Sequence, residues 1–71
     1  MITKTIGKRI REVRTIRSMT QFDLGLVIGK DRSVVAKYEA GDIDIPITVL
    51  NDIARALKVK VGDLVKNGKS I

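Results

Sequence analysis

Residues 20–41, TQFDLGLVIGKDRSVVAKYEAG, decide the fold, because they predict two short helices joined by a tight turn. Thr20 is the expected cap of the first helix, since its hydroxyl can accept an orphan backbone N–H. Asp23 stands three residues later, where a carboxylate completes a capping box. Apolar residues then follow at helical spacing and predict one buried face, formed by Leu24, Val27 and Ile28. Gly29 predicts the end of this helix, because glycine adopts the left-handed conformation without strain.

The second helix of this stretch is expected to begin after Asp31, a second candidate cap, and to end at Gly41. At about 100° per residue, one face carries small or hydrogen-bonding side chains, namely Arg32, Ser33, Ala36, Lys37 and Ala40. The opposite face is apolar and consists of Val34, Val35 and Tyr38. Helix, glycine-containing turn and helix are the layout of a DNA-binding helix-turn-helix, and the small, polar outer face suits a major groove. An ordinary amphipathic surface helix shows the same spacing and is the alternative interpretation.

The chain resembles the Cro and phage-repressor type of helix-turn-helix, a family of bacterial and phage transcription regulators, over residues 6 to 65 or so. The resemblance rests on the order and spacing of short pieces: Gln21 after a threonine cap, Leu24, Gly29, Val35, Glu39-Ala40-Gly41, Ile10-Arg11-Glu12-Val13-Arg14, Leu50, Ile53-Ala54-Arg55-Ala56-Leu57 and Leu64. It implies a compact, all-α domain of five helices, with the helix-turn-helix formed by the second and third.

Two residues depart from the family pattern. Gly25 stands where alanine is usual, which costs helix stability of roughly 1 kcal/mol. Lys58 stands where glycine is usual, so the fourth helix can end differently.

The resemblance also implies which residues meet DNA and which hold the domain together. The implied base contacts are Arg32, Ser33, Ala36 and Lys37. The implied backbone contacts are Gln21 and the start of the second helix, with weaker candidates at Thr20, Lys30 and Ala40. An ion pair between Arg14 and Glu39 is implied as a tie between the first and third helices, against the alternative of two separate surface charges.

The rest of the chain predicts three further helices and no strand. The first is expected from a cap at Thr3 or Thr5 to Arg17 or Ser18, with an apolar stripe formed by Ile6, Ile10 and Val13. The fourth has Pro46 in its first turn and Asp44 as a possible cap, and it buries Leu50, Ile53, Ala54 and Leu57. A short fifth helix covers residues 62–65. We therefore expect a single domain over residues 1–71, with an ordered core over about 5–65 and a flexible tail over about 66–71.

Composition excludes several kinds of chemistry. The chain has no cysteine and no histidine, so disulfides, zinc fingers and Cys or His nucleophile systems are absent. No metal, cofactor or active site is expected, because the acids Asp42, Asp44, Asp52 and Asp63 lie near helix starts, where carboxylates ordinarily serve as caps. No apolar run approaches the roughly 20 residues that a bilayer requires. These features predict a cytoplasmic protein without a membrane partner, associated with the nucleoid when it is bound to DNA.

The positive charge is concentrated in the helix-turn-helix half of the chain. Net charge is +6, and residues 1–41 hold nine Lys or Arg against four acids, whereas residues 42–71 hold five against four. A positive field of this kind is expected to attract a phosphate-bearing partner. A basic surface that is merely solvated would show the same excess of Lys and Arg.

We therefore predict a sequence-specific regulator that binds double-stranded DNA, most simply a repressor that excludes polymerase from a palindromic operator as a homodimer. The dimer interface is expected in the C-terminal third, at Val59, Val61 and Val65, each of which could instead complete the core. The alternative is an antitoxin or other protein-interaction module that binds a toxin and autoregulates its own operon. A regulator of a restriction–modification operon is a further possibility within the DNA-binding class.

Overall fold

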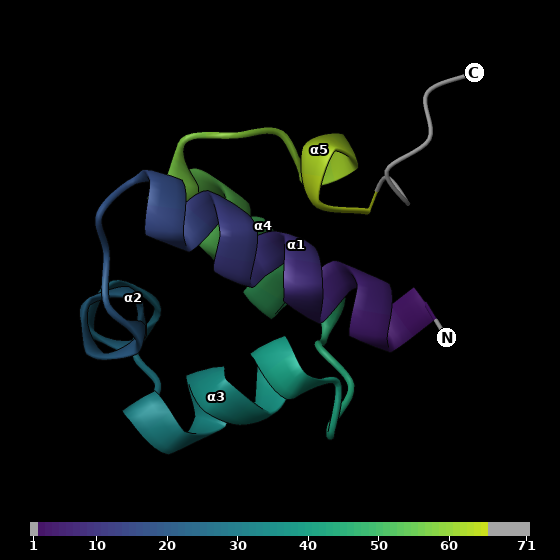
Figure 1. The fold of residues 1–71 in the computed structure, drawn as a ribbon, viewed down its shortest axis with the longest axis horizontal. Coiled ribbons are helices and arrows are strands. Elements are labelled where there is room, and N and C mark those ends of the chain that lie inside the picture. Colours follow the sequence, from purple (N-terminus) through teal and green to yellow (C-terminus); the bar gives the residue numbers. More distant parts are fainter. Residues whose placement is uncertain (1, 66–71) are drawn as a thin grey trace.

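The computed structural model describes residues 2–65, which form five helices and, within that range, no strand. The helices are α1 (Ile2–Ile16), α2 (Gln21–Ile28), α3 (Arg32–Ala40), α4 (Ile47–Leu57) and α5 (Val61–Val65). Figure 1 shows α1 across the middle of the molecule, with α3 on one side of it and α5 on the other. The predicted all-α, five-helix fold is confirmed, and the predicted flexible tail lies outside the described residues.

One hydrophobic core receives a side chain from every helix. The fully buried members are Ile10, Leu24, Val35, Ile53, Leu57 and Leu64. Removing each of these side chains from water contributes roughly 1.5–3 kcal/mol, so the apolar stripes read from the sequence supply the force that assembles the helices.

The prediction that Val27 belongs to the buried face of α2 is wrong, since its side chain is 62% exposed. Leu24 and Gly25 are buried and Ile28 is partly buried, so the buried side of this short helix does not extend to Val27. Val27 instead lies at the edge of the groove between α2 and α4.

Local hydrogen bonds set the start of α2 as predicted. The Thr20 hydroxyl accepts the Asp23 N–H at 2.9 Å, and the Asp23 carboxylate accepts the Thr20 N–H at 2.9 Å, so the capping box is complete. Asp31 occupies the N-cap position of α3 without a capping hydrogen bond from its side chain. Pro46 likewise precedes α4, one residue before the first turn in which it was expected. Helix α1 begins at Ile2, earlier than a cap at Thr3 or Thr5 would allow.

Four helices end in the same way, with one residue in the left-handed conformation. These residues are Ser18, Gly29, Gly41 and Lys58, with φ of 59°, 72°, 76° and 60°. In each case the next N–H bonds the carbonyl five residues back, which is the longer bond of a Schellman motif. Lys58 therefore ends α4 in the left-handed conformation that glycine adopts most readily, so the lysine does not prevent this form of helix end.

Two helical glycines lie where another stretch of backbone passes close. A Cβ atom on Gly25 would lie 2.5 Å from the carbonyl oxygen of Lys30, in the turn between α2 and α3. A Cβ atom on Gly7 would lie 2.6 Å from the carbonyl oxygen of Glu39, near the end of α3. Gly25 was expected only to weaken α2, but its missing side chain is what lets the turn fold back this tightly.

Candidate nucleic-acid interface

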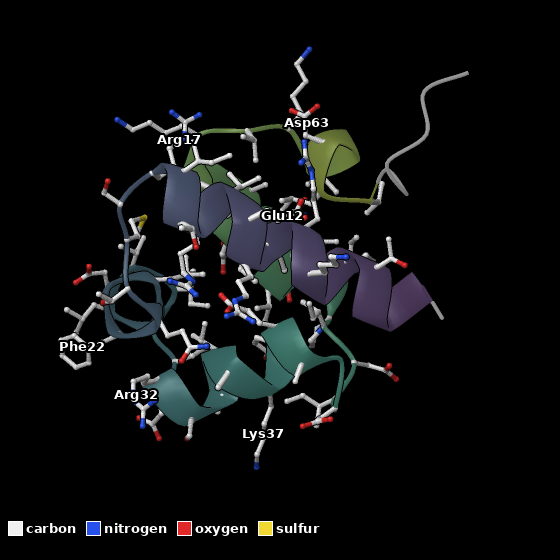
Figure 2. The ribbon with its side chains drawn as sticks, viewed as in Figure 1. Glu12, Arg17, Phe22, Arg32, Lys37 and Asp63 are labelled. Carbon is white, nitrogen blue, oxygen red and sulfur yellow. The ribbon has the colours of Figure 1, made fainter. Side chains whose placement is uncertain are left out.

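The outer face of α3 forms one polar surface. Arg32, Ser33, Lys37 and Ala40 are exposed and Ala36 is half-buried, whereas Val35 and Tyr38 on the inner face are buried. Figure 2 shows Arg32 and Lys37 extending from α3 away from the rest of the molecule. The structure therefore brings the four predicted base-contacting residues onto a single free helix face, where they can reach a ligand together.

The inner end of α3 is fixed to α1 by an ion pair. Arg14 donates from Nε to Glu39 Oε2 at 2.6 Å and from Nη2 to Oε1 at 3.0 Å. A third donor, Nη1, reaches the Met19 carbonyl at 2.7 Å, in the connection between α1 and α2. The side chain of Arg14 is 12% exposed and that of Glu39 is 3% exposed. α1, the α1–α2 connection and α3 are therefore joined at a site that is largely shielded from water.

Gln21 adds a link that sequence reasoning missed. Its Nε2 donates to Glu39 Oε1 at 3.1 Å, so the residue predicted to touch a DNA phosphate also fastens the start of α2 to the end of α3. No local pattern signals this bond, because the two residues are 18 positions apart. With it, the Glu39 carboxylate of α3 accepts hydrogen bonds from side chains of α1 and of α2, so this one residue links three helices.

The remaining backbone candidates lie at the edges of this surface. Thr20, Lys30 and Ala40 are all exposed, at the start of α2, in the turn and at the end of α3. At the α2 start, the pKa of Asp23 is held below its ordinary value of 3.8, chiefly by the backbone N–H of Thr20 and also by the Thr20 hydroxyl. The Asp23 carboxylate thus places one negative charge in the first turn of α2, where it interacts favourably with the helix dipole.

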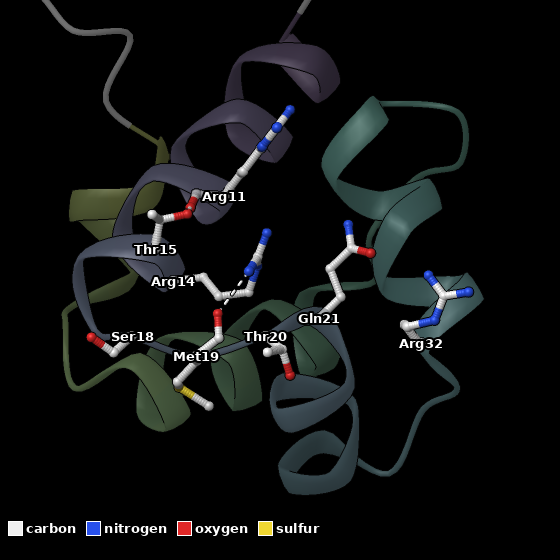
Figure 3. Close-up of a pocket in the computed structure, with 8 residues that line it drawn as sticks. All are labelled: Arg11, Arg14, Thr15, Ser18, Met19, Thr20, Gln21 and Arg32. Carbon is white, nitrogen blue, oxygen red and sulfur yellow. Dashed lines mark hydrogen bonds between the residues drawn. The ribbon is translucent and has the colours of Figure 1, made fainter.

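An open cleft of about 570 Å³ separates α1 from the helix-turn-helix (Figure 3). Its lining residues are Arg11, Arg14, Thr15, Ser18, Met19, Thr20, Gln21 and Arg32. Sequence reasoning placed Arg11 only within the first-helix motif. The available signal was its spacing of three residues from Arg14, which puts both on neighbouring positions of one helix face.

The residues predicted for a dimer interface lie around the other end of the molecule. Figure 1 shows α5 across α1 from α3. Val59 and Val61 are partly buried against the core, and Val65 is 39% exposed. Two of the three therefore complete the monomer's core in part, and Val65 offers the larger free apolar surface.

Within residues 2–65, no three His, Cys, Asp or Glu side chains are grouped closely enough to hold a metal ion. Over the same range, every helix is too short or too polar to traverse a bilayer.

Comparison with known proteins places this geometry in a family. The helix-turn-helix family profile matches residues 10–64. The restriction-modification controller protein C.AhdI from Aeromonas hydrophila shares the fold with a TM-score of 0.84, at 31% identity over 87% of this chain and 94% of that one.

Two longer proteins are also similar. An HTH-type transcriptional regulatory protein of Methanospirillum hungatei is 54% identical over 35 residues, which are 49% of this chain and 11% of that protein. The antitoxin PezA of Streptococcus pneumoniae is 26% identical over 66 residues, which are 93% of this chain and 42% of the antitoxin. The chain thus spans less than half the length of either relative. Since the family profile covers most of the chain and a solved structure matches nearly end to end, this chain belongs to the helix-turn-helix family of the Cro and phage-repressor type.

Proposed function

We propose that this protein is a transcription regulator that binds double-stranded DNA and reads its sequence through α3. The observation that carries the proposal is the combination of an exposed, polar outer face on α3 with an inner end fixed by Arg14, Gln21 and Glu39. A helix that enters a major groove needs both features, because its side chains must be free while its backbone stays in register with the base edges.

In this proposal the residues have two different roles. Arg32, Ser33, Ala36 and Lys37 face the base edges, where a guanidinium can contact guanine O6 and N7 and where small residues allow close approach. Thr20, Gln21, Lys30 and Ala40 face the phosphates on either side and fix the position of the helix without reading sequence.

The simplest regulatory mechanism is repression by occupancy. One α3 helix covers only a few base pairs, so a homodimer would place two of them in successive major grooves, about one turn apart, on a near-palindromic operator. The exposed Val65, together with Val59 and Val61, is the apolar surface proposed for the contact between protomers. Occupying the operator in this way would exclude polymerase, and the protein would act in the cytoplasm, on the nucleoid.

Selection of bound sequences from a random duplex pool tests the proposal. We expect enrichment of a short motif repeated with two-fold symmetry, and a stoichiometry of two protomers per selected duplex. A pool that stays random after repeated selection would refute sequence-specific binding. One protomer per duplex, together with a monomer at high protein concentration, would refute the homodimer alone.

The similarity to PezA supports a second candidate, in which the chain binds a toxin protein and represses its own operon. The similarity to C.AhdI supports a controller of a restriction–modification operon instead. Co-expression with the neighbouring genes separates them: a toxin partner should co-purify with the chain in a fixed ratio, whereas a controller should purify alone and bind its own promoter.

A further inference from the structure

Two guanidinium groups that line the cleft between α1 and the helix-turn-helix have no partner among the described side chains. The side chains of Arg11 and Arg32 are exposed, and neither guanidinium makes an ion pair or hydrogen bond with another residue in the range 5–65. The neighbouring arginines on α1 and just after it are already engaged, since Arg9 bonds Glu12 and the Asp63 carbonyl, and Arg17 donates to the Lys58 carbonyl. The unsatisfied positive charge on this side of α1 is therefore concentrated at the cleft.

The lining of the cleft favours an anion with several oxygens. None of its eight lining residues is acidic, and Ser18 adds a hydroxyl group. The Thr15 hydroxyl already donates to the Arg11 carbonyl, and Thr20 and Gln21 are bonded to Asp23 and Glu39. Figure 3 shows Arg11 reaching from α1 and Arg32 from α3, with Arg14 and Gln21 between them. A guanidinium fork matches the geometry of a phosphate, so Arg11 and Arg32 are the lining groups that such an anion would contact.

Arg32 connects this cleft to the proposed reading surface. It lies at the first turn of α3 and also lines the cleft, so a duplex whose major groove receives α3 would carry its nearest strand past the start of α2. The residue that the strand would meet next is Arg11, which lies on α1.

The geometry points to Arg11 as a backbone-positioning residue, which binds a phosphodiester oxygen in this cleft on the strand that flanks the groove entered by α3. The inference rests on the proposed function and adds α1 to the DNA contacts. Arg11 contributes a charge-assisted hydrogen bond that fixes the duplex against α1 and carries no sequence information. Its loss would weaken every duplex alike.

The first test compares Arg11→Gln with the wild type on the selected operator and on random duplex. The substitution keeps a good helix former on an exposed position, so folding should be preserved. We expect both duplexes to lose affinity by the same factor and the salt slope to fall by about 0.9, the value for one phosphate. In consequence, raising salt fourfold should weaken the wild type about 3.5 times more than the variant.

Lys60→Gln is the matched control, because it removes one exposed positive charge from the connection between α4 and α5, across α1 from α3 (Figure 1). Its binding and salt slope should stay close to those of the wild type. Equal effects of the two substitutions would mean that only net charge matters and would overturn the assignment of Arg11.

The second test identifies the phosphate. Operators that carry a single neutral methylphosphonate at each successive position are titrated with both proteins. One position per half-site should weaken the wild type and leave Arg11→Gln unaffected, because the variant has already lost that contact. If no position loses its effect in the variant, Arg11 touches no phosphate and the inference is wrong. Binding of inorganic phosphate that depends on Arg11, without any such coupling in the duplex, would assign the cleft to a free anion and likewise refute it.

The tests distinguish failure of the inference about Arg11 from failure of the proposed function. If the wild type binds no duplex at all, the proposed function fails and this inference fails with it. If the wild type selects an operator and Arg11→Gln binds it with unchanged affinity and salt slope, only the inference fails.

Discussion

Arg14 and Glu39, which lie 25 residues apart, are joined by two parallel hydrogen bonds, at 2.6 Å from Nε and 3.0 Å from Nη2. The carboxylate also accepts a bond from Gln21, and the guanidinium also donates to the Met19 carbonyl. This one pair therefore links α1, α2 and α3 at a single point, close to the end of the helix whose outer face is exposed.

Removing either partner of this pair should strongly destabilise the folded protein. Arg14→Met would leave a carboxylate that is 3% exposed without its counter-charge, and the expected cost is about 3–5 kcal/mol. Glu39→Gln should cost less than Arg14→Met, because an amide can still accept a hydrogen bond. Urea unfolding of both single variants and the double variant measures the coupling. Small and additive effects would show that the pair contributes little to stability.

Gly7 and Gly62 should respond to alanine in opposite directions. A Cβ at Gly7 meets backbone atoms of α3 that cannot move aside, so Gly7→Ala should destabilise the protein by about 1–3 kcal/mol. At Gly62, within α5, nothing lies within 4 Å of the added carbon. Gly62→Ala should therefore gain about 0.4–1 kcal/mol. Thermal melts of the two variants, run side by side, provide the measurement, and equal shifts would contradict the close approach of α1 to α3.

Lys58→Gly should stabilise the end of α4. Lys58 has φ of 60°, and a left-handed backbone costs a non-glycine residue roughly 1–2 kcal/mol. Glycine escapes that strain but loses more chain entropy on folding, so we expect a net gain of about 0.5–1 kcal/mol. Arg55→Gly, within α4, should instead cost about 1 kcal/mol. Chemical denaturation of both variants decides, and a loss at Lys58 would mean that its side chain compensates for the strained backbone.

The capping box of α2 should give the protein an acid-sensitive contribution to stability. The Thr20 N–H and hydroxyl lower the pKa of Asp23 below 3.8 in the folded protein. A lowered folded pKa means that the stabilisation is present above the unfolded value and disappears as pH falls through the folded value. The difference in urea midpoint between the wild type and Asp23→Asn should therefore shrink between about pH 6 and pH 2. A difference that stays constant over this range would show that the charge of Asp23 plays no part.

Substitutions of Arg32 and of Gln21 should distinguish the reading of base sequence from the positioning of the DNA backbone. Arg32→Ala should lose about 1–3 kcal/mol on the preferred operator and discriminate less at one position in each half-site. Gln21→Ala should weaken all duplexes by a similar factor and keep the sequence preference. Titration of both variants against the operator, single-base changes and random duplex, at two fixed salt concentrations, tests this. If Arg32→Ala keeps the specificity ratio of the wild type, α3 does not read sequence through this residue.

The sequence by itself determined the helices, most of the helix ends and the core. Thr20 with Asp23, Gly29 and Gly41 act through bonds within one turn of chain, and that is why their roles could be predicted before any fold was known. Ile10 and Val13 in α1, and Leu50, Ile53 and Leu57 in α4, stand at helical spacing within one helix, so these buried faces followed from periodicity. The error at Val27 arose because periodicity gives the direction of a face and not the width that a neighbouring helix will cover.

Only the tertiary structure decided how α3 is held and what surrounds it. The bond from Gln21 to Glu39, the close approach of Gly7 to the end of α3 and the placing of Arg11 and Arg32 along one cleft all depend on residues distant in the chain. Such contacts depend on the angles at which helices pack, and those angles emerge from the sum of many weak side-chain contacts that no local pattern encodes. The sequence thus specified which residues are available for binding, and packing determined which of them share a surface.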